Sequence, residues 1–259
     1  RGDDISPFGI SLSDRISGIP LHVDISDLPI KKGITNNRNK VIFGPSGSGK
    51  SFLTNHVLNS YLKSGAHVVA VDVGDSYERL SILNGGTYLR YDEDNPITFN
   101  PFYVLPEHRG VEKNQSLLTL IFTLWQPILN IKEELDEYSI ISEALTEYYK
   151  WIDKNSDVFM CFNSFYEFMR DQFFVNLEED RKSLISISSF FNVLKMFYKE
   201  GEFEYLLNSK SNIDLLNEQF IVFELDNIQD HPILFPAVTL MIMDTFITKM
   251  RTLEGIRKV

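Results

Sequence analysis

Eight consecutive residues of this chain have the types and spacing of a phosphate-binding, or Walker A, loop. The pattern GxxxxGK[ST] is filled here by Gly44-Pro45-Ser46-Gly47-Ser48-Gly49-Lys50-Ser51. Glycines in such a loop permit the positive φ angles that turn successive backbone N–H groups toward a phosphate. The lysine would carry its ammonium to the β- and γ-phosphates, and the serine hydroxyl is an oxygen ligand suited to Mg²⁺. The pattern predicts nucleotide binding with Mg²⁺.

The loop requires a strand before it and a helix after it. Lys40–Phe43 is short, apolar and β-branched, which predicts the strand. Residues 51–62 carry apolar side chains at helical spacing, which predicts a helix that begins at the loop and points its positive end at the phosphates. Phe52, in the first turn of that helix, is included among the predicted nucleotide-binding residues. The alternative, an accidental turn rich in glycine and serine, would not bring both flanking elements with it.

Two further apolar runs predict strands of the same sheet. Residues 67–74 are expected to form a fully buried strand, with Gly65 ending the helix before it. Asp72 then lies at the carboxyl end of the strand, where open α/β sheets bind ligands, although an ordinary acid at a strand end fits equally well. Residues 220–226 form the second run and contain Glu224 and Asp226. Glu224 is the candidate catalytic acid, because an acid from a second strand is needed to complete the metal shell and position water.

Composition limits the classes of protein that fit. The chain has 259 residues, 43% of them hydrophobic, enough for one large α/β domain or a core domain with an insertion. A formal charge of −11 argues against a broad nucleic-acid surface and leaves a local basic patch possible. Cys161 is the single cysteine, so an intrachain disulfide is excluded; its apolar neighbours predict a core residue. The five histidines do not have metal-ligand spacing.

The order of the predicted elements divides the chain into four parts. Residues 1–39 are an approach segment with an edge strand at 21–25, and residues 40–110 are the first part of the nucleotide-binding core. Residues 111–217 are a helical insertion, and residues 218–259 return to the core with a strand and a long helix at 233–251. The chain begins at Arg1 and lacks an apolar run of 18 residues, which predicts an excised or processed segment without a membrane span.

The insertion is predicted to contain helices at about 113–126, 132–154, 162–175 and 183–199, with breaks at Pro127, 155–157 and 177–180. It is rich in aromatic residues. Because this stretch is acidic, the aromatics are interpreted as core rather than as a base-stacking surface. They are Tyr148, Tyr149, Trp151, Phe162, Phe165, Tyr166, Phe168, Phe173, Phe174, Phe190, Phe191, Phe197 and Tyr198.

Four stretches in this order resemble the TraG-type conjugation ATPases of Bacteroidetes conjugative elements, which are type IV secretion ATPases related to the HerA and FtsK motors. The stretches are the loop with Phe52, residues 71–77, residues 95–102 and residues 223–228. The resemblance implies a RecA-like P-loop NTPase core with a largely parallel sheet and an all-α insertion. It also implies that Lys50 is the loop lysine and that Ser51 binds Mg²⁺.

The same resemblance implies a motor that hydrolyses ATP to power conjugative DNA transfer or type IV secretion. Such a protein would be cytoplasmic, peripheral at the inner membrane, hexameric when intact, and in contact with other conjugation-apparatus proteins. In the family an apolar strand ending in paired acids follows about where Val259 stands, so Arg257–Val259 resembles its first step. The segment would then lack the C-terminal part of the core and the second acidic motif, and by itself could be inactive.

Two alternatives remain open from the sequence. One is a DNA-pumping motor of the FtsK or coupling-protein kind, for which direct nucleic-acid binding is the distinguishing property. The other is a nucleotide-gated interaction module that binds ATP as a switch without turnover and docks partners through the acidic insertion.

Overall fold

The computed structural model describes residues 6–92, 94, 96–125, 135–210, 215, 217–253 and 255–259. The chain forms two compact units. The sheet unit comprises Arg1–Arg90, Asp214–Asp226 and Thr248–Val259, and the helical unit comprises Tyr91–Ile213 and Asn227–Ile247. The sequence predicted four parts, with boundaries after residues 39, 110 and 217, and this division stays a prediction. The compact units divide the chain after residues 90, 213, 226 and 247.

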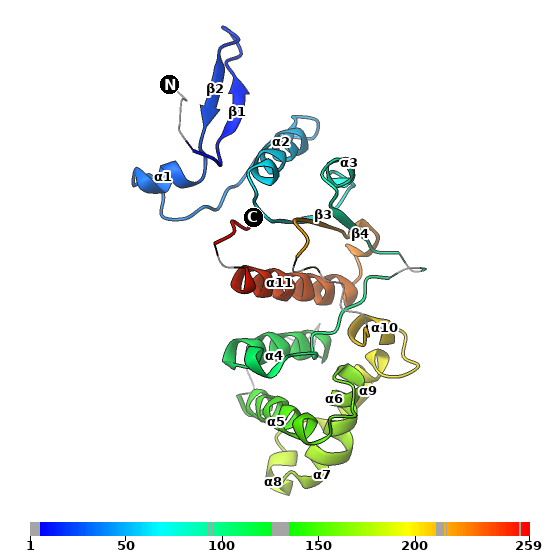
Figure 1. Cartoon of the computed structure of the whole chain (residues 1–259). Coiled ribbons are helices and arrows are strands. Elements are labelled where there is room, and N and C mark those ends of the chain that lie inside the picture. Colours follow the sequence, from blue (N-terminus) through cyan, green and yellow to red (C-terminus); the bar gives the residue numbers. More distant parts are fainter. Residues whose placement is uncertain are drawn as a thin grey trace. The chain divides into compact units, whose positions relative to one another are not determined.

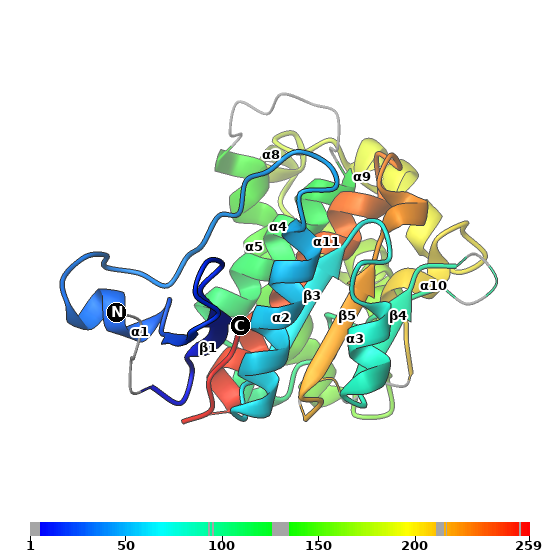
Figure 2. The same ribbon diagram turned by 90° about the horizontal axis from the view of Figure 1, so that it is seen from above.

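A three-stranded parallel sheet organises the sheet unit. Its order is β3 (Val68–Asp72), β5 (Phe220–Glu224) and β4 (Thr87–Arg90), with β5 buried along its whole length. Helices α2 (Lys50–Lys63) and α3 (Glu78–Leu83) cover one face of this sheet (Figures 1 and 2). The predicted α/β class and largely parallel sheet are confirmed.

Side chains of alternating direction on the strands fill the space beneath these helices. The core cluster joins residues of α2, β3, α3 and β5: Leu58, Leu62, Val68, Ala70, Leu80, Phe220 and Val222. Gly86 lies so close to β5 that a Cβ there would come within 2.9 Å of the Phe220 carbonyl oxygen. A glycine is therefore required for β4 to enter the sheet beside β5.

The predicted full burial of residues 67–74 is wrong on one side of β3. Val71 is 49% exposed, whereas Val68 and Ala70 are buried in the cluster beneath α2, because alternate side chains of a strand point to opposite faces of the sheet. The edge of β3 that faces away from β5 is paired at its start. There His67 donates to the Arg257 carbonyl at 2.8 Å, and Val259 donates to the His67 carbonyl at 2.9 Å. Lys258 thus bridges His67 in parallel, as expected for the beginning of a strand at Arg257–Val259.

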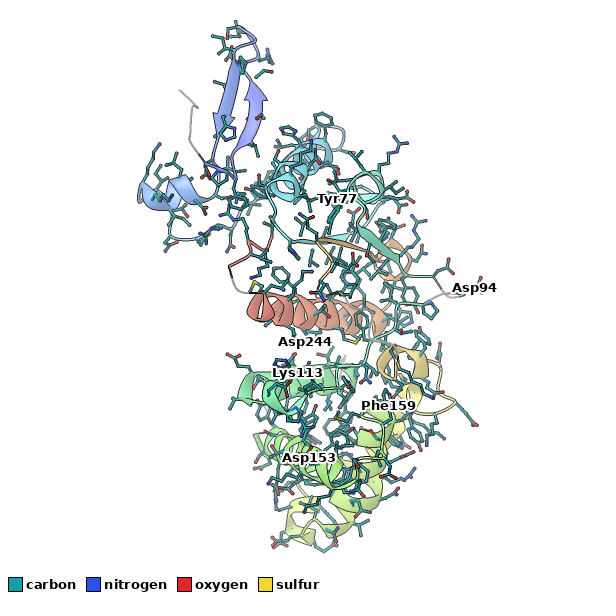
Figure 3. The ribbon with its side chains drawn as sticks, in the orientation of Figure 1. Tyr77, Asp94, Lys113, Asp153, Phe159 and Asp244 are labelled. Carbon is teal, nitrogen blue, oxygen red and sulfur yellow. The ribbon has the colours of Figure 1, made fainter. Side chains whose placement is uncertain are left out.

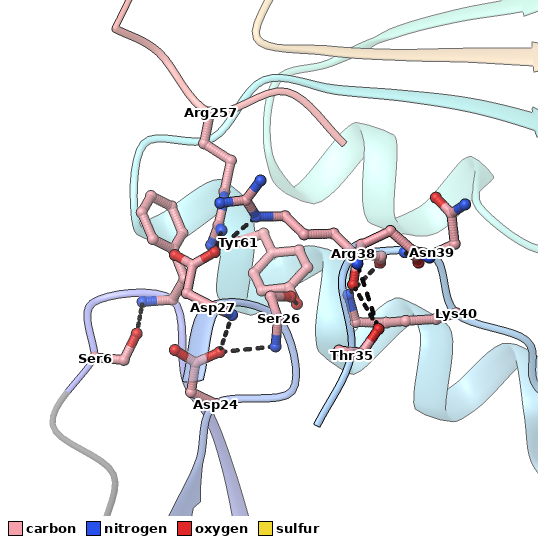
Figure 4. Close-up of polar contacts among 12 residues, drawn as sticks. Ser6, Asp24, Ser26, Asp27, Thr35, Arg38, Asn39, Lys40, Tyr61 and Arg257 are labelled. Atoms are coloured by element: carbon pink, nitrogen blue, oxygen red, sulfur yellow. Dashed lines mark hydrogen bonds and ion pairs between the residues drawn. The ribbon is translucent and has the colours of Figure 1, made fainter. Parts of the chain in front are cut away.

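Residues 6–40 contain a hairpin and a short helix and do not form an edge of the main sheet. Strand β2 (Pro20–Val23), predicted at 21–25, pairs antiparallel with β1 (Ile10–Ser13) as a separate ribbon. Helix α1 (Asp27–Lys31) follows (Figure 1). The Asp24 carboxylate accepts hydrogen bonds from the Ser26 and Asp27 amides, both at 2.8 Å (Figure 4). These bonds satisfy two of the free N–H groups at the start of α1.

Helices build the second unit, as the sequence predicted for most of this region. The longer ones are α4 (Val111–Trp125), α5 (Leu135–Lys154), α6 (Phe162–Phe168), α9 (Ile187–Leu194) and α11 (Leu234–Thr252), whose last turn belongs to the sheet unit. Between α6 and α9 lie a π-helical turn (Met169–Phe173), α7 (Phe174–Asn176) and α8 (Glu179–Lys182), and α10 (Glu204–Leu207) follows α9. Of the described residues, none forms a helix both long and apolar enough to span a bilayer.

The predicted helix 183–199 and the break at 177–180 need correction. Helix α8 begins inside the predicted break, because Glu179 and Asp180 are favourable in the first turn of a helix. Helix α9 starts at Ile187, and a 3₁₀ turn at Lys195–Phe197 follows it. The break predicted at Pro127 and the first residues of the helix predicted at 132–154 lie outside the described residues, as does Asn95 in the segment before α4.

The aromatic residues of the helical unit form its core, as predicted. All thirteen are buried except Trp151, Phe191 and Tyr198, which are half-buried. The ring of Phe102 packs against Tyr148, Phe162 and Phe165 with centroid distances of 5.1–6.5 Å. Cys161 is a buried free thiol, also as predicted.

Candidate nucleotide-binding site

The loop at residues 44–49 has the backbone that the glycine spacing predicts. Gly47 and Gly49 have φ angles of 76° and 90°, in the left-handed region where side chains are disfavoured. Gly44 has a different reason to be glycine, since a Cβ there would lie 2.4 Å from the Ser48 hydroxyl oxygen. Helix α2 then begins at Lys50, with Gly49 as its N-cap. The predicted helix after the loop is confirmed.

Lys50 closes this loop on itself. Its ammonium donates to the carbonyl oxygens of Gly44 and Pro45, at 2.9 and 3.0 Å. These two bonds join the first residues of the loop to the first residue of α2. A cation is therefore fixed beside a run of exposed backbone at a helix N-terminus, which is the setting in which phosphate groups are bound.

The segment before the loop differs from its prediction. Lys40–Phe43 is not part of any strand that the structure describes, and Val41 and Phe43 are 73% and 90% exposed. Apolar β-branched residues favour a strand only where a neighbouring strand offers hydrogen-bond partners. The described part of the sheet has β3, β5 and β4 in that order, and none of them pairs with residues 40–43.

Charged side chains meet in register at the carboxyl ends of the three strands. Asp72 is paired with Glu224 across β3 and β5, and Glu224 is paired with Arg90 across β5 and β4. The positions predicted for Asp72 and Glu224 at strand ends are therefore confirmed. The position of Arg90 in register with Glu224 was not foreseen, because it depends on the strand order and register of the sheet.

Backbone donors surround the Glu224 carboxylate. It accepts from the amides of Gly74, Asp75 and Asp226 at 3.1, 2.8 and 3.0 Å, and the residue is 1% exposed. The Tyr88 hydroxyl approaches it at 3.4 Å while donating to Asp75 at 2.7 Å. In the described structure, Glu224 therefore holds the two loops that follow β3 and β5.

Asp72 shares this buried site with Glu224. Its carboxyl group accepts from the Ser76 amide and lies in register with Glu224 on the adjacent strand. Burial, followed by the nearby Glu224 charge, raises the pKa of Asp72 above its ordinary value, against the lowering effect of the Ser76 bond.

Comparison with known proteins supplies the family. The TraG P-loop domain matches residues 9–259, which is nearly the whole chain. The chain belongs to the TraG P-loop domain family. It is 39% identical over 72 residues to Protein TraC of Escherichia coli (strain K12), a match covering 27% of this chain and 8% of TraC.

A solved structure has the same fold. The structure of VirB4 of Thermoanaerobacter pseudethanolicus superposes with a TM-score of 0.62 and 21% sequence identity, over 96% of this TraG P-loop domain and 64% of that chain. The domain therefore spans less than two thirds of the VirB4 chain and a small part of TraC.

The residues of the TraG P-loop domain fit a nucleotide and Mg²⁺ by their donor chemistry. The loop offers backbone N–H groups held by left-handed glycines, Lys50 offers a cation, and Ser51 offers an exposed hydroxyl in the first turn of α2. Phe52 is 82% exposed beside them. The described residues do not contain a cluster of three or more acidic, histidine or cysteine side chains that could bind a metal by itself.

Sequence reasoning missed the side chains that fasten the loop after β3. They are Thr54, Asn55, Asp75, Tyr88 and Arg90. Gly74-Asp75-Ser76 directly after a strand was a signal for a tight loop at the ligand-binding edge. The partners of that loop come from α2 and β4, so spacing in the sequence could not reveal them.

Proposed function

We propose that this TraG P-loop domain binds ATP with Mg²⁺ through residues Gly44–Phe52. The observation that carries the proposal is the closed loop, in which Lys50 bonds to the carbonyls of Gly44 and Pro45 and leads directly into α2. A bound triphosphate would supply the anionic charge that this site lacks. The loop amides and the Lys50 ammonium would neutralise the β- and γ-phosphates.

The remaining loop residues have supporting roles. The Ser51 hydroxyl would be a Mg²⁺ ligand, and Mg²⁺ when bound would help to neutralise the charge of the phosphates. Pro45, Ser46 and Ser48 shape the loop, with the Ser48 amide donating to the Pro45 carbonyl at 3.3 Å. Phe52 would contribute its backbone amide and its exposed ring to the nucleotide side of the helix.

We propose Glu224 as the acid that assists hydrolysis. Its three backbone hydrogen bonds support an indirect role, in which it fixes the loops beside the site. A direct role in the metal shell would require some of these bonds to be exchanged. Whether this domain alone hydrolyses ATP is therefore decided by turnover measurements on the wild type and on Glu224→Gln.

For the whole protein, we propose an ATPase motor of conjugative DNA transfer or type IV secretion. Support comes from the family and from the fold shared with VirB4. Such a motor would work in the cytoplasm at the inner membrane, as a hexamer in contact with other proteins of the conjugation apparatus. Direct contact with DNA is a separate question, which salt-dependent binding to DNA would answer.

Isothermal titration with a non-hydrolysable ATP analogue, with and without Mg²⁺, tests nucleotide binding. We expect saturable binding by the wild type and its loss in Lys50→Ala. In Ser51→Ala the gain in affinity from Mg²⁺ should be lost while metal-free binding persists. A folded wild type, verified by circular dichroism, that binds no nucleotide would refute the proposal.

A further inference from the structure

Two neighbouring residues of α2 link the phosphate loop to the loop after β3. The Thr54 hydroxyl donates to the Lys50 carbonyl at 3.0 Å and lies beside the Tyr77 hydroxyl, where it opposes the rise in the pKa of Tyr77. The Asn55 amide nitrogen donates to the Ser51 carbonyl at 2.9 Å and to the Ser76 carbonyl at 3.0 Å. Each side chain therefore joins one functional residue of the phosphate loop to one residue of the 74–77 loop. We call this arrangement the double clamp.

The 74–77 loop is held equally firmly on its other side. Glu224 accepts from the amides of Gly74 and Asp75, and Asp72 accepts from the amide of Ser76. Asp75 has a φ of 57°, a left-handed conformation that is unfavourable for a residue with a side chain. Tyr88 and Arg90 both bind its carboxylate, which keeps it in that conformation.

Tyr77 anchors the end of this loop in the core. Its ring packs against the cluster beneath α2 and α3, and its side chain is seen beside these helices in Figure 3. Burial raises the pKa of Tyr77, so its hydroxyl remains a neutral hydrogen-bonding group beside Thr54. Through the loop, the first turn of α2 is thereby tied to the carboxyl ends of β3 and β5.

We propose that Thr54 and Asn55 are positioning residues whose double clamp fixes Ser51 where its hydroxyl can bind Mg²⁺. This inference rests on the proposed nucleotide function. The long side chain of Lys50 can follow a displaced phosphate, whereas the hydroxyl of Ser51 is one bond from Cβ and depends on the position of the helix turn. Mg²⁺ requires short and nearly ideal coordination distances, so the metal-dependent part of binding is the part that the clamp controls.

The first measurement follows the clamp without nucleotide. Amide hydrogen exchange is compared among the wild type, Thr54→Val and Asn55→Leu, which remove hydrogen bonds at nearly constant volume. We expect exchange at residues 74–77 to accelerate by about three- to tenfold in each variant, the effect of one or two lost hydrogen bonds. Unchanged exchange in both variants would overturn the proposal.

Matched controls come from the same chain. Thr239 donates to the Phe235 carbonyl at 2.7 Å, and Asn84 donates to the Leu80 carbonyl at 3.0 Å, each four residues back along its helix. Thr239→Val and Asn84→Leu therefore remove the local bond without touching the double clamp. Neither control should alter exchange at residues 74–77. If they accelerate it as much as the clamp variants do, the effect is general loosening and the proposal fails.

The second measurement asks whether the clamp serves metal binding. The titration with the ATP analogue is run with and without Mg²⁺ for the same variants. We expect the gain in affinity from Mg²⁺ to be about tenfold smaller in Thr54→Val and Asn55→Leu than in the wild type. Their affinity without metal should stay within about twofold of the wild-type value. Thr54→Ser, which keeps the hydroxyl, should restore the wild-type response. Equal loss with and without Mg²⁺, or no rescue by serine, would contradict the positioning role.

The two proposals fail in different ways. Absence of nucleotide binding in the folded wild type would refute the nucleotide function and with it the role of the clamp in metal binding. Normal binding that is lost in Lys50→Ala, together with an unchanged Mg²⁺ response in both clamp variants, would refute the clamp alone.

Discussion

Asp72 and Glu224 lie opposite each other on adjacent parallel strands, so that the charge of Glu224 acts on the carboxyl group of Asp72. Glu224 accepts three backbone amides, whereas Asp72 accepts fewer and has a raised pKa because of burial and the charge of Glu224. Asp72 is therefore easier to protonate in the folded protein than in the unfolded chain.

Asp72→Asn should stabilise the protein at neutral pH. A pKa raised above 3.8 in the folded state means that folding takes up a proton, so stability falls as pH rises from that value through the raised pKa. Asparagine donates to Glu224 and accepts from Ser76 without titrating. The free energy of unfolding, measured with urea from pH 3 to pH 8, should show a flatter profile in the variant and convergence with the wild type at the acidic end. A variant less stable at pH 7 than the wild type would contradict this assignment.

Glu224→Ala should destabilise the fold far more than a surface substitution does. Three backbone N–H groups at Gly74, Asp75 and Asp226 would lose their acceptor at a site that is 1% exposed. Leaving such donors unsatisfied costs about 1–3 kcal/mol each where water cannot replace the acceptor, so we expect a total of roughly 2–5 kcal/mol. Urea unfolding gives the value. Glu224→Gln keeps one acceptor oxygen, so its stability should lie between those of the wild type and the alanine variant. A loss in the free energy of unfolding below about 1 kcal/mol in the alanine variant would argue against this role.

Local chemistry explains what could be predicted from the sequence at this site. The left-handed glycines, Lys50 and helix α2 were all foreseen, because the loop and its helix are contiguous and their conformations follow from residue type. The aromatic core of the helical unit was foreseen for a similar reason, since its spacing is helical. The error at Lys40–Phe43 has the opposite cause: a strand depends on a neighbour, and apolar composition does not specify one.

Contacts between distant segments explain what the sequence did not reveal. Tyr88 and Arg90 reach Asp75 beside Glu224 only because β4 pairs with β5 in one register. Asn55 is an unremarkable polar residue on a helix until the 74–77 loop is placed beside it. The residues that carry the further inference are therefore the ones for which strand order, rather than sequence spacing, is decisive.

Phe102→Ala should strongly destabilise the helical unit. The ring is fully buried and packs between Phe162 and Phe165, and replacing it leaves a cavity. Such truncations cost about 3–5 kcal/mol. Its neighbour Tyr103 is 42% exposed, so Tyr103→Ala is a matched control that should cost about 1 kcal/mol or less. Near-UV circular dichroism during urea unfolding measures both, and similar losses in the two variants would contradict the assigned core.

The helical unit also contains a polar contact whose removal should be measurable. Asp244 of α11 accepts from Lys113 at 2.6 Å and from Ser116 at 2.8 Å, both residues of α4; Figure 3 labels Lys113 and Asp244. Asp244→Asn should cost about 1–2 kcal/mol, because one charge-assisted bond becomes neutral in a half-buried site. A double-mutant cycle with Lys113→Met isolates the pair, and a coupling energy near zero would show that the contact does not stabilise the unit.

Asp27→Asn tests the electrostatic contact between the start and the end of the sheet unit. The Asp27 carboxylate binds Arg38 at 2.7 Å and also binds Arg257, whose guanidinium lies 4.0 Å from the centroid of the Phe8 ring (Figure 4). Burial alone would raise its pKa, but these two arginines hold the pKa of Asp27 below its ordinary value.

The direction of the shift determines the expected pH dependence. A lowered pKa contributes stability that is present above 3.8 and is lost as pH falls through the folded-state value. At pH 7 the variant should therefore lose about 1–3 kcal/mol, mainly because Arg257, with only 11% of its side chain exposed, loses its charged partner. Urea unfolding at pH 7 and at pH 3 measures the difference. The Arg38 side chain is 62% exposed, so Arg38→Met should lower the free energy of unfolding much less than Arg257→Met does. Equal losses in the two variants would show that Asp27 does not act mainly through Arg257.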